Sequence, residues 1–562
     1  MSSHDDLLAL ADEYWEGQMQ ASPFFATFLG DHRYDDQVDD LSHEAEVARR
    51  HELVGLQNRT EALAADGLEP EDRVTRSLLL AELADGIETI DLRLTELRSD
   101  QMQGIHADLL VMAPQMNAPE PDHARMAVAR LREFGTMLDQ ATTRFREGLA
   151  AGRTPARINI DRSLNQIDGY LSSPIDTDGF VSLRGPADWD GEPAWREELT
   201  DAVQDVVRPA FARYRSVLAE ELLPEARPDD QCGLSWIEDG PEIYAALVRF
   251  HTGVDLGAEE IHAIGMEEVT EKLPAEYAEV GQRLFGLSDE AKIFRRLLDD
   301  PSLRYKNGDE ILADARRCLE TATEAVPEWF GIRPVARCEL TPVPDFLAAD
   351  APGAYYTPPA PDGSRPGEYH VNLHQPGQKS RFETASIAFH ESIPGHHLQL
   401  AIASERTDLP KFQRLSFGRT AFVEGWALYT ERLAEEMGLY RSDLDRMGML
   451  ASDSWRACRL VMDTGLHAMG WSRDQAIDFM VQHAPVSREE VVVEVDRYIG
   501  MPGQALAYKI GQREILRLRA ESRERLGDRF AIRGFHDTVL GSGTVSLPVL
   551  RDLVESWQGS AA

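Results

Sequence analysis

One motif constrains this chain more than any other, the sequence Phe-His-Glu-Ser-Ile-Pro-Gly-His-His-Leu-Gln at 389–399. It begins like the helical motif His-Glu-x-x-His, in which two histidines four residues apart share a zinc ion and the glutamate acts as general base. His390 and Glu391 occupy the first two positions, but Pro394 stands where the second zinc histidine belongs. The motif is therefore either a damaged metal site or a metal site built around a distorted helix.

A regular helix cannot join His390 to the histidines that follow. His397 would lie roughly 10 Å along the axis at about 1.5 Å per residue, whereas zinc–nitrogen bonds are about 2.0–2.1 Å long. His396 would be nearer but on another face. Pro394 removes a backbone donor and Gly395 tolerates unusual backbone angles, so we expect a local bulge. The alternative is a helix that ends at Pro394 and leaves surface histidines, but the apolar run before His390 argues against it.

A third ligand is expected in the segment Ala-Phe-Val-Glu-Gly-Trp-Ala-Leu-Tyr at 421–429, where Glu424 is the only charged residue. Burial of a lone carboxylate is costly unless the group is paired or binds a metal. An ion pair with Arg419 or Arg432 is the alternative. With His390 and a later histidine, Glu424 would complete a His₂Glu set for one zinc ion and leave a fourth position open for water.

These segments resemble the bacterial domain-of-unknown-function family 885, and the resemblance spans nearly the whole chain. It rests mainly on the segments 390–399, 422–431, 459–471 and 497–511. That family is similar in fold to the carboxypeptidase Taq zinc peptidases and, more distantly, to angiotensin-converting enzyme. The resemblance implies a mainly helical fold with a deep central cleft, metal binding through His390, His396 and Glu424, and Glu391 as base. His396 is preferred to His397 on this ground, and because a shorter bulge sacrifices less helix.

A polar stripe crosses the otherwise apolar stretch 451–469, and part of it is expected to line the cleft. Arg459, Asp463 and His467 follow one another at steps of four, and Arg456 extends the stripe. Arg456 or Arg459 would receive a substrate carboxylate through a bidentate pair, and His467 is a further candidate for substrate binding. Asp463 could orient His467 or a zinc histidine. The alternative is a solvated helix face.

Two tyrosines are candidates for stabilising the oxyanion that forms when water attacks a peptide carbonyl. Tyr508 is preferred because it follows the break at 502–503 and shares a helical face with Gly511, and Tyr498 is second. The alternative for either is a packed ring with a satisfied hydroxyl.

Upstream of the metal motif, 354–357 and 368–373 are expected to be strands joined by a turn at 361–367. The edge of such a hairpin can pair with an extended peptide, and Tyr369 on its second strand is a candidate substrate contact. A hairpin that only packs is the alternative.

The fold class that we expect is mainly α, a large helical zinc-metallopeptidase-like fold with a small hairpin or sheet beside the metal helix. Residues 1–340 are expected to form a mostly helical lobe that walls or caps the cleft, with a clear helical period at 125–149 and a kink or break at Pro209 in the helix 198–223. Residues 341–562 are expected to form the catalytic lobe, intertwined with the first.

The formal net charge of −39 argues against nucleic acid and anionic membranes as partners. The four cysteines show no paired spacing, and the chain has neither a long apolar run nor a signal-peptide start, so we expect a cytoplasmic protein with reduced thiols. Its expected function is zinc-dependent hydrolysis of small peptides, as a carboxypeptidase or oligopeptidase. The alternatives are a non-catalytic metal-binding or small-molecule-binding protein, which the Pro-Gly insertion favours, and a zinc amidohydrolase of non-peptide substrates.

Overall fold

The computed structural model describes residues 2–112, 116–344, 348, 351–360, 363, 365–416 and 418–559. Within them the chain is mainly helical with one small three-stranded sheet, which confirms the mainly α class. No helix in these ranges combines the length and the apolar character that a membrane span requires.

The helices and strands follow one another in three groups. The first is α1 (Ser3–Ala21), α2 (Pro23–Phe28), α3 (His43–Ala62), α4 (Pro70–Asp91), α5 (Ile105–Met112), α6 (Pro121–Ala150), α7 (Arg157–Ser172), α8 (Glu192–Ala202), α9 (Arg208–Val217) and α10 (Leu223–Glu225). The second is α11 (Gly240–Thr252), α12 (Ala258–Glu267), α13 (Leu273–Phe285), α14 (Glu290–Asp299), α15 (Gly308–Trp329), β1 (Cys338–Pro342), β2 (Ala354–Thr357) and β3 (Gly367–Val371). The third is α16 (Glu383–Glu391), α17 (His396–Glu405), α18 (Lys411–Arg414), α19 (Thr420–Glu436), α20 (Asp443–His467), α21 (Arg473–His483), α22 (Arg488–Gly500), α23 (Ala507–Leu526), α24 (Ile532–Leu540) and α25 (Leu547–Ser556).

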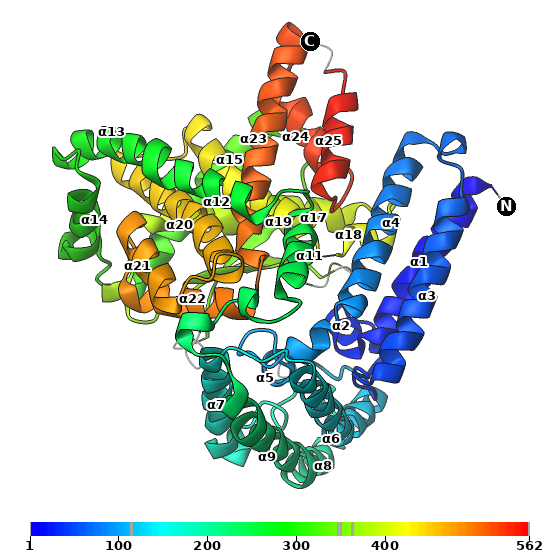
Figure 1. The fold of residues 1–562 in the computed structure, drawn as a ribbon. Coiled ribbons are helices and arrows are strands. Elements are labelled where there is room, and N and C mark those ends of the chain that lie inside the picture. Colours follow the sequence, from blue (N-terminus) through cyan, green and yellow to red (C-terminus); the bar gives the residue numbers. More distant parts are fainter. Residues whose placement is uncertain are drawn as a thin grey trace.

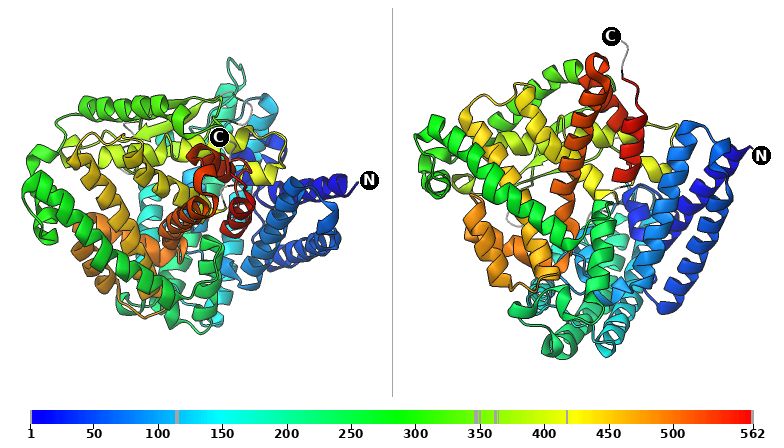
Figure 2. Two further views of the ribbon diagram at one scale, coloured as in Figure 1. Left: turned by 90° about the horizontal axis from the view of Figure 1, so that it is seen from above. Right: turned by 45° about the horizontal axis from the view of Figure 1, so that its top comes forward.

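The first long helices lie at one edge of the molecule. In each view α1, α3 and α4 lie side by side at one edge of the molecule, and α13 and α14 lie at the opposite edge (Figure 1, Figure 2). Helices α6 to α9 form a separate group below them in the view of Figure 1. The long helices α19, α20 and α23 run through the part of the molecule between these groups (Figure 1).

Buried apolar side chains form two clusters. The smaller one is built mainly from α5 to α9 and includes Phe134, Phe180 and Phe211. The larger one joins α1, α3 and α4 to most of the chain from Cys232 to Val554. The segments before and after residue 340 share the larger cluster.

In the described residues, three π-helical turns widen two long continuous helices, each turn just before a proline. These turns are Val203–Val207, Leu218–Leu222 and Glu268–Lys272, and each is followed by an α-helical segment whose second residue is proline. A proline ring collides with the carbonyl of the preceding turn and offers no N–H, and a wider turn relieves both problems. The break expected at Pro209 is thus a widened turn in a continuous helix.

The sheet has the strand order β1-β3-β2. Strands β2 and β3 pair antiparallel, with Tyr356 opposite Tyr369, so the two expected strands are confirmed. Residues 361, 362 and 364 of the expected turn lie outside the described residues. Strand β1 pairs parallel to β3 and is half-exposed. The sequence does not predict this strand, because Cys-Glu-Leu-Thr-Pro lacks the apolar run of a buried strand.

Candidate metal centre

The metal motif is a complete interruption between two helices and not a bulge within one. Helix α16 ends at Glu391, and α17 begins at His396 after a loop that contains a cis Ile393–Pro394 peptide bond. Gly395 has an ordinary negative φ of −78°, so its role is not the one expected from the sequence. A Cβ atom on Gly395 would lie 2.0 Å from the carbonyl oxygen of His390, and only glycine permits this close return of the chain.

Helix α19 holds this interruption in place. A break in a helix leaves carbonyl groups without their usual partners, and these must be satisfied in a buried site. The Trp426 Nε1–H donates to the carbonyl of Pro394 at 3.0 Å, and the Thr430 hydroxyl donates to the carbonyl of Phe389 at 3.1 Å. Since α19 also carries Glu424, the same contacts fix this carboxylate relative to the two histidines.

Three side chains converge across the interruption. Oε2 of Glu424 lies 3.4 Å from Nε2 of His390 and 3.5 Å from Nε2 of His396. Their ligand atoms all lie within 4.8 Å of one another, and no other such group of three is found among the described residues. The Glu424 Oε2 atom is buried and makes no hydrogen bond of acceptable geometry. Two imidazoles and one carboxylate form a donor set that catalytic zinc sites use. Here one oxygen of the carboxylate has no hydrogen-bond partner and is available to a metal ion.

Glu431 orients the first histidine. Its Oε1 atom accepts a hydrogen bond from Nδ1–H of His390 at 2.8 Å, and its second oxygen accepts one from the hydroxyl of Ser386. Glu431 is only 1% exposed. A carboxylate in this position fixes the tautomer of a metal-binding histidine and leaves Nε2 free to coordinate. Nδ1 of His396, in contrast, is buried without a hydrogen bond to the described residues.

The charges of the cluster shift one another's pKa values. Burial acts to lower the pKa of His390, but its interactions with Glu424 and Glu431 outweigh burial and raise the pKa to about 9. Burial acts to raise the pKa of Glu424, but His396 and His390 hold it well below its usual range. The centre therefore attracts positive charge, either a proton or a metal ion.

His397 is not brought to this cluster. Its Nδ1 lies 2.9 Å from the hydroxyl of Tyr356, and its Nε2 lies 3.2 Å from the carbonyl oxygen of Ala336. Burial lowers the pKa of His397 to about 4, so the ring is neutral. With both nitrogens engaged beside the sheet, this side chain supports the loop between α16 and α17.

The alternative ion pairs of Glu424 are also absent. Arg419 pairs with Glu82 and Asp85, and Arg432 pairs with Glu276 and Asp453. Neither arginine therefore neutralises Glu424, which is consistent with a carboxylate that binds a metal ion.

A cavity of about 500 Å³ lies next to the cluster. It is enclosed by residues of β2, β3, α16, α20, α22 and α23, and the predicted residues on its wall are Tyr369, Glu391, Arg456, Arg459 and Tyr508. Burial raises the pKa of Glu391, while His390 and His396 oppose that shift. The ring of Tyr508 stacks over that of His390 with centroids 6.5 Å apart. The cavity thus reaches the proposed base and the tyrosine that stacks on one ligand of the cluster.

Arg459 lines this cavity with one hydrogen-bond donor that has no partner among the described residues. It is only 6% exposed, yet its Nη1 atom makes no hydrogen bond with the described residues. Its Nε–H donates to the hydroxyl of Tyr498 at 2.7 Å, and its Nη2 donates to Glu494 at 3.1 Å. The guanidinium carbon lies 4.5 Å from the ring centroid of Tyr508. Arg459 is thus held in place by these contacts, while its Nη1 remains available to another acceptor.

Arg456 lies on the same wall but is less constrained. Its Nη1 donates to the hydroxyl of Ser452 at 2.6 Å, and its Nε is buried without a partner among the described residues. It is a second cation on the wall of this cavity.

Two predicted site residues lie away from the cavity. Tyr498 is fully buried, and its hydroxyl donates to Glu494 at 2.6 Å, so it supports Arg459 and does not line the cavity. His467 accepts from the N–H of Leu234 at 3.2 Å and donates to the carbonyl of Tyr498 at 2.9 Å. Burial lowers the pKa of His467 to about 4, which makes it a neutral core histidine.

Asp463 orients neither His467 nor a histidine of the cluster. Its carboxylate accepts hydrogen bonds from the hydroxyl of Tyr244 at 2.6 Å and from the N–H of Gly503 at 3.0 Å. It therefore fixes the turn that leads into α23 and Tyr508.

A pair of glycines sets the distance between Glu424 and Tyr508. Helices α19 and α23 cross where a Cβ on Gly425 would lie 2.4 Å from the Cα of Gly511. A Cβ on Gly511 would lie 1.9 Å from the carbonyl oxygen of Ala421. Larger residues at either position would force apart the helices that carry the ligand and the tyrosine.

Most of the chain matches one known protein family. Residues 23–554 match the family described as "Bacterial protein of unknown function (DUF885)". The chain belongs to this family. No curated protein sequence matches it.

Two solved structures resemble this member of the DUF885 family. One is a protein from Colwellia psychrerythraea described as a "putative lipoprotein", with 26% identity, a TM-score of 0.92 and 99% of each chain covered. The other, from Shewanella oneidensis, has the same description with unknown function, 20% identity and a TM-score of 0.76, and covers 97% of this chain and 99% of its own. The second likeness concerns the fold alone. The cytoplasmic location expected from the sequence stays a prediction.

Proposed function

We propose that this protein is a zinc-dependent hydrolase of small peptides that acts as a carboxypeptidase, with a fold like that of the carboxypeptidase Taq zinc peptidases and the cavity beside the cluster as part of a substrate cleft. The observation that carries the proposal is the convergence of His390 and His396 on the unsatisfied Oε2 of Glu424. A zinc ion held there would polarise a carbonyl group and lower the pKa of water. The Pro-Gly insertion does not argue for a merely binding protein, because it is what returns His396 to the cluster.

Glu391 is the proposed general base. It follows His390 directly and lines the cavity, and its raised pKa suits a carboxyl group that accepts a proton from water and passes it to the leaving amine. The Tyr508 hydroxyl is proposed to donate a hydrogen bond to the developing oxyanion, since the ring lies on the cavity wall beside His390.

Arg459 is the proposed binding site for a free C-terminal carboxylate. A guanidinium binds a carboxylate with charge-assisted hydrogen bonds, and Arg459 offers an unpartnered buried Nη1. Residues Gly353 and Ala354 at the edge strand β2 also line the cavity, where an extended peptide could pair with them. These features favour a peptide over a non-peptide amide.

The test combines metal analysis with peptide hydrolysis. The purified protein is measured for bound metal and then for release of C-terminal residues from a peptide panel, with and without chelator. The Glu391→Gln variant should keep its zinc and lose at least a hundredfold in kcat, because general base catalysis contributes about 10²–10⁴-fold. Full activity of Glu391→Gln, or activity that survives complete metal removal, would sink the proposal.

A further inference from the structure

A second cavity of about 330 Å³ lies where the N-terminal helices meet α11 and the end of α22. None of the three metal-cluster residues lines it, and neither do Glu391 and Arg459. Its walls come from α4, the segment 92–103, the start of α7, α11 and residues 499–502. Its size is at the lower end of the range for small-molecule sites, about 300–1,000 Å³.

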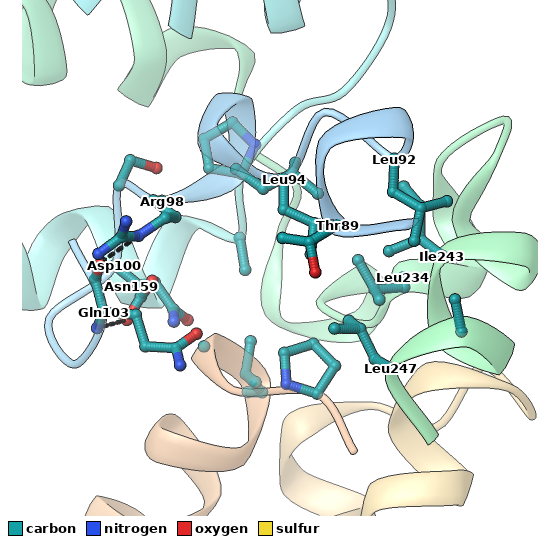
Figure 3. A pocket seen from close by; sticks show the side chains of 18 of the residues that line it. Thr89, Leu92, Leu94, Arg98, Asp100, Gln103, Asn159, Leu234, Ile243 and Leu247 are labelled. Carbon is teal, nitrogen blue, oxygen red and sulfur yellow. Dashed lines mark hydrogen bonds between the residues drawn. The ribbon is translucent and has the colours of Figure 1, made fainter. Parts of the chain in front are cut away.

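The cavity has one polar end and one apolar end. Arg98, Asp100, Gln103 and Asn159 gather at one end, whereas aliphatic side chains line the other (Figure 3). The labelled aliphatic residues are Leu92, Leu94, Leu234, Ile243 and Leu247. A ligand that fits this arrangement is amphiphilic and has a short apolar body.

One acceptor at the polar end lacks a hydrogen-bond donor, because Arg98 at this end donates to Asp108 and to the carbonyl of Gln103. Asn159 is 3% exposed, and its Oδ1 atom makes no hydrogen bond with the described residues. Asp100 is 5% exposed, and its Oδ1 accepts only the backbone N–H groups of Met102 and Gln103 at 2.7 and 2.8 Å. Burial raises the pKa of Asp100 to about 6. An ammonium group would donate to Oδ1 of Asn159 and would offset the cost of burying the Asp100 carboxylate.

Arg227 on the same cavity wall lacks an anion. It is 9% exposed, its Nε and Nη2 donate to the carbonyls of Gln231 and Cys232 at 3.1 and 3.0 Å, and its Nη1 has no partner among the described residues. No described carboxylate forms an ion pair with it, and burial lowers its pKa to about 10. An uncompensated buried guanidinium is costly, and a ligand carboxylate would compensate it.

We propose that this cavity binds a free aliphatic α-amino acid. Its carboxylate would meet Arg227, its ammonium group would meet Asp100 and Asn159, and its side chain would lie along the leucine-rich wall. A monocarboxylate would leave Oδ1 of Asn159 without a donor, and an amine would leave Arg227 without an anion. This inference does not depend on the proposed hydrolase activity.

The test is calorimetric titration of the full chain with L-leucine. We expect saturable binding that Arg227→Gln weakens at least tenfold. Ala246→Phe, which places a ring in the cavity from α11, should abolish it. Circular dichroism and thermal melts establish that each variant folds. 4-Methylpentanoate and 3-methylbutylamine should each bind at least tenfold more weakly than leucine. Absence of saturable leucine binding, or equal binding of 4-methylpentanoate, would overturn the proposal.

Arg459→Gln is the control for the cavity beside the metal cluster. We expect this variant to bind L-leucine as the unaltered protein does. Leucine binding that is lost in Arg459→Gln but survives in Ala246→Phe would place the amino acid in that other cavity and would overturn the inference.

Discussion

Nδ1 of His390 lies 2.8 Å from Oε1 of Glu431, and this hydrogen bond joins the last turn of α16 to α19 in the core. Because the carboxylate can only accept, the imidazole carries its proton on Nδ1 and directs Nε2 toward Glu424. The pair therefore sets both the orientation and the protonation of the proposed ligand.

Replacement of Glu431 by Gln should weaken zinc binding without removing a ligand. Outer carboxylates of this kind contribute about 10–100-fold in metal affinity. Competition with a chromophoric chelator measures the change. Glu435→Gln is the matched control, because Glu435 lies on the same helix but pairs with Arg446 near the surface. Equal affinities of the two variants would mean that Glu431 does not orient His390.

Zinc affinity should depend on pH through His390. In the protein without a bound ion, burial acts to lower the pKa of this histidine, but Glu424 and Glu431 raise it to about 9. Zinc binds only the neutral ring, so protons compete with the metal and affinity falls as the pH decreases below that value. Calorimetry in buffers of different ionisation enthalpy should show release of about one proton from this ring at pH 7. Binding that releases no proton would contradict this account.

Arg459→Met should impair substrates with a free C-terminus selectively. Loss of a charge-assisted hydrogen bond costs about 1.5–3 kcal/mol, which is roughly ten- to a hundredfold in kcat/KM. C-terminally amidated peptides should be affected much less by the same change, and this comparison separates loss of recognition from a general disturbance of the Tyr498 and Glu494 contacts. An equal effect on both kinds of peptide would argue against carboxylate recognition.

Gly511→Ala should destabilise the protein, because the new Cβ would lie 1.9 Å from the carbonyl oxygen of Ala421 and force α19 and α23 apart. Overpacking of this kind costs about 1–3 kcal/mol. Gly55→Ala is the control, since nothing lies within 4 Å of a Cβ there and alanine favours the helix. Thermal melts should rank Gly511→Ala below and Gly55→Ala at or above the unaltered protein. A neutral Gly511→Ala would show that the glycine contact does not set the helix spacing.

The sequence predicts the helical class, the two strands, His390 and Glu424 because each has a local signal, whereas the choice of His396 over His397 also rests on the family resemblance. The periodicity at 125–149 corresponds to α6, and the lone charge of Glu424 in an apolar run marks a residue with a special partner. The predicted bulge within one helix is wrong, because α16 ends at Glu391 and α17 begins at His396. The cause of this interruption is a close approach between Gly395 and the carbonyl of His390, which depends on the path of the chain in space.

The supporting residues could not be found in this way because their partners are far apart in the sequence. Glu431 shares a helical face with Glu424, which is a signal, but its contact with His390 spans 41 residues. Glu494 lies three and four residues before Arg497 and Tyr498, yet its role is to hold Arg459 on another helix. The helical stripe that suggested His467 as a cleft residue is real, but that end of α20 faces Leu234 and the backbone of Tyr498.

The central claim is that His390, His396 and Glu424 hold one zinc ion. The most direct test is the zinc content of the purified protein and of two neighbouring variants, His396→Ala and His397→Ala, measured by mass spectrometry after equal exposure to zinc. We predict one zinc ion per chain in the unaltered protein and in His397→Ala, and a loss of nearly all zinc in His396→Ala. Full zinc in His396→Ala together with its loss in His397→Ala would contradict the account.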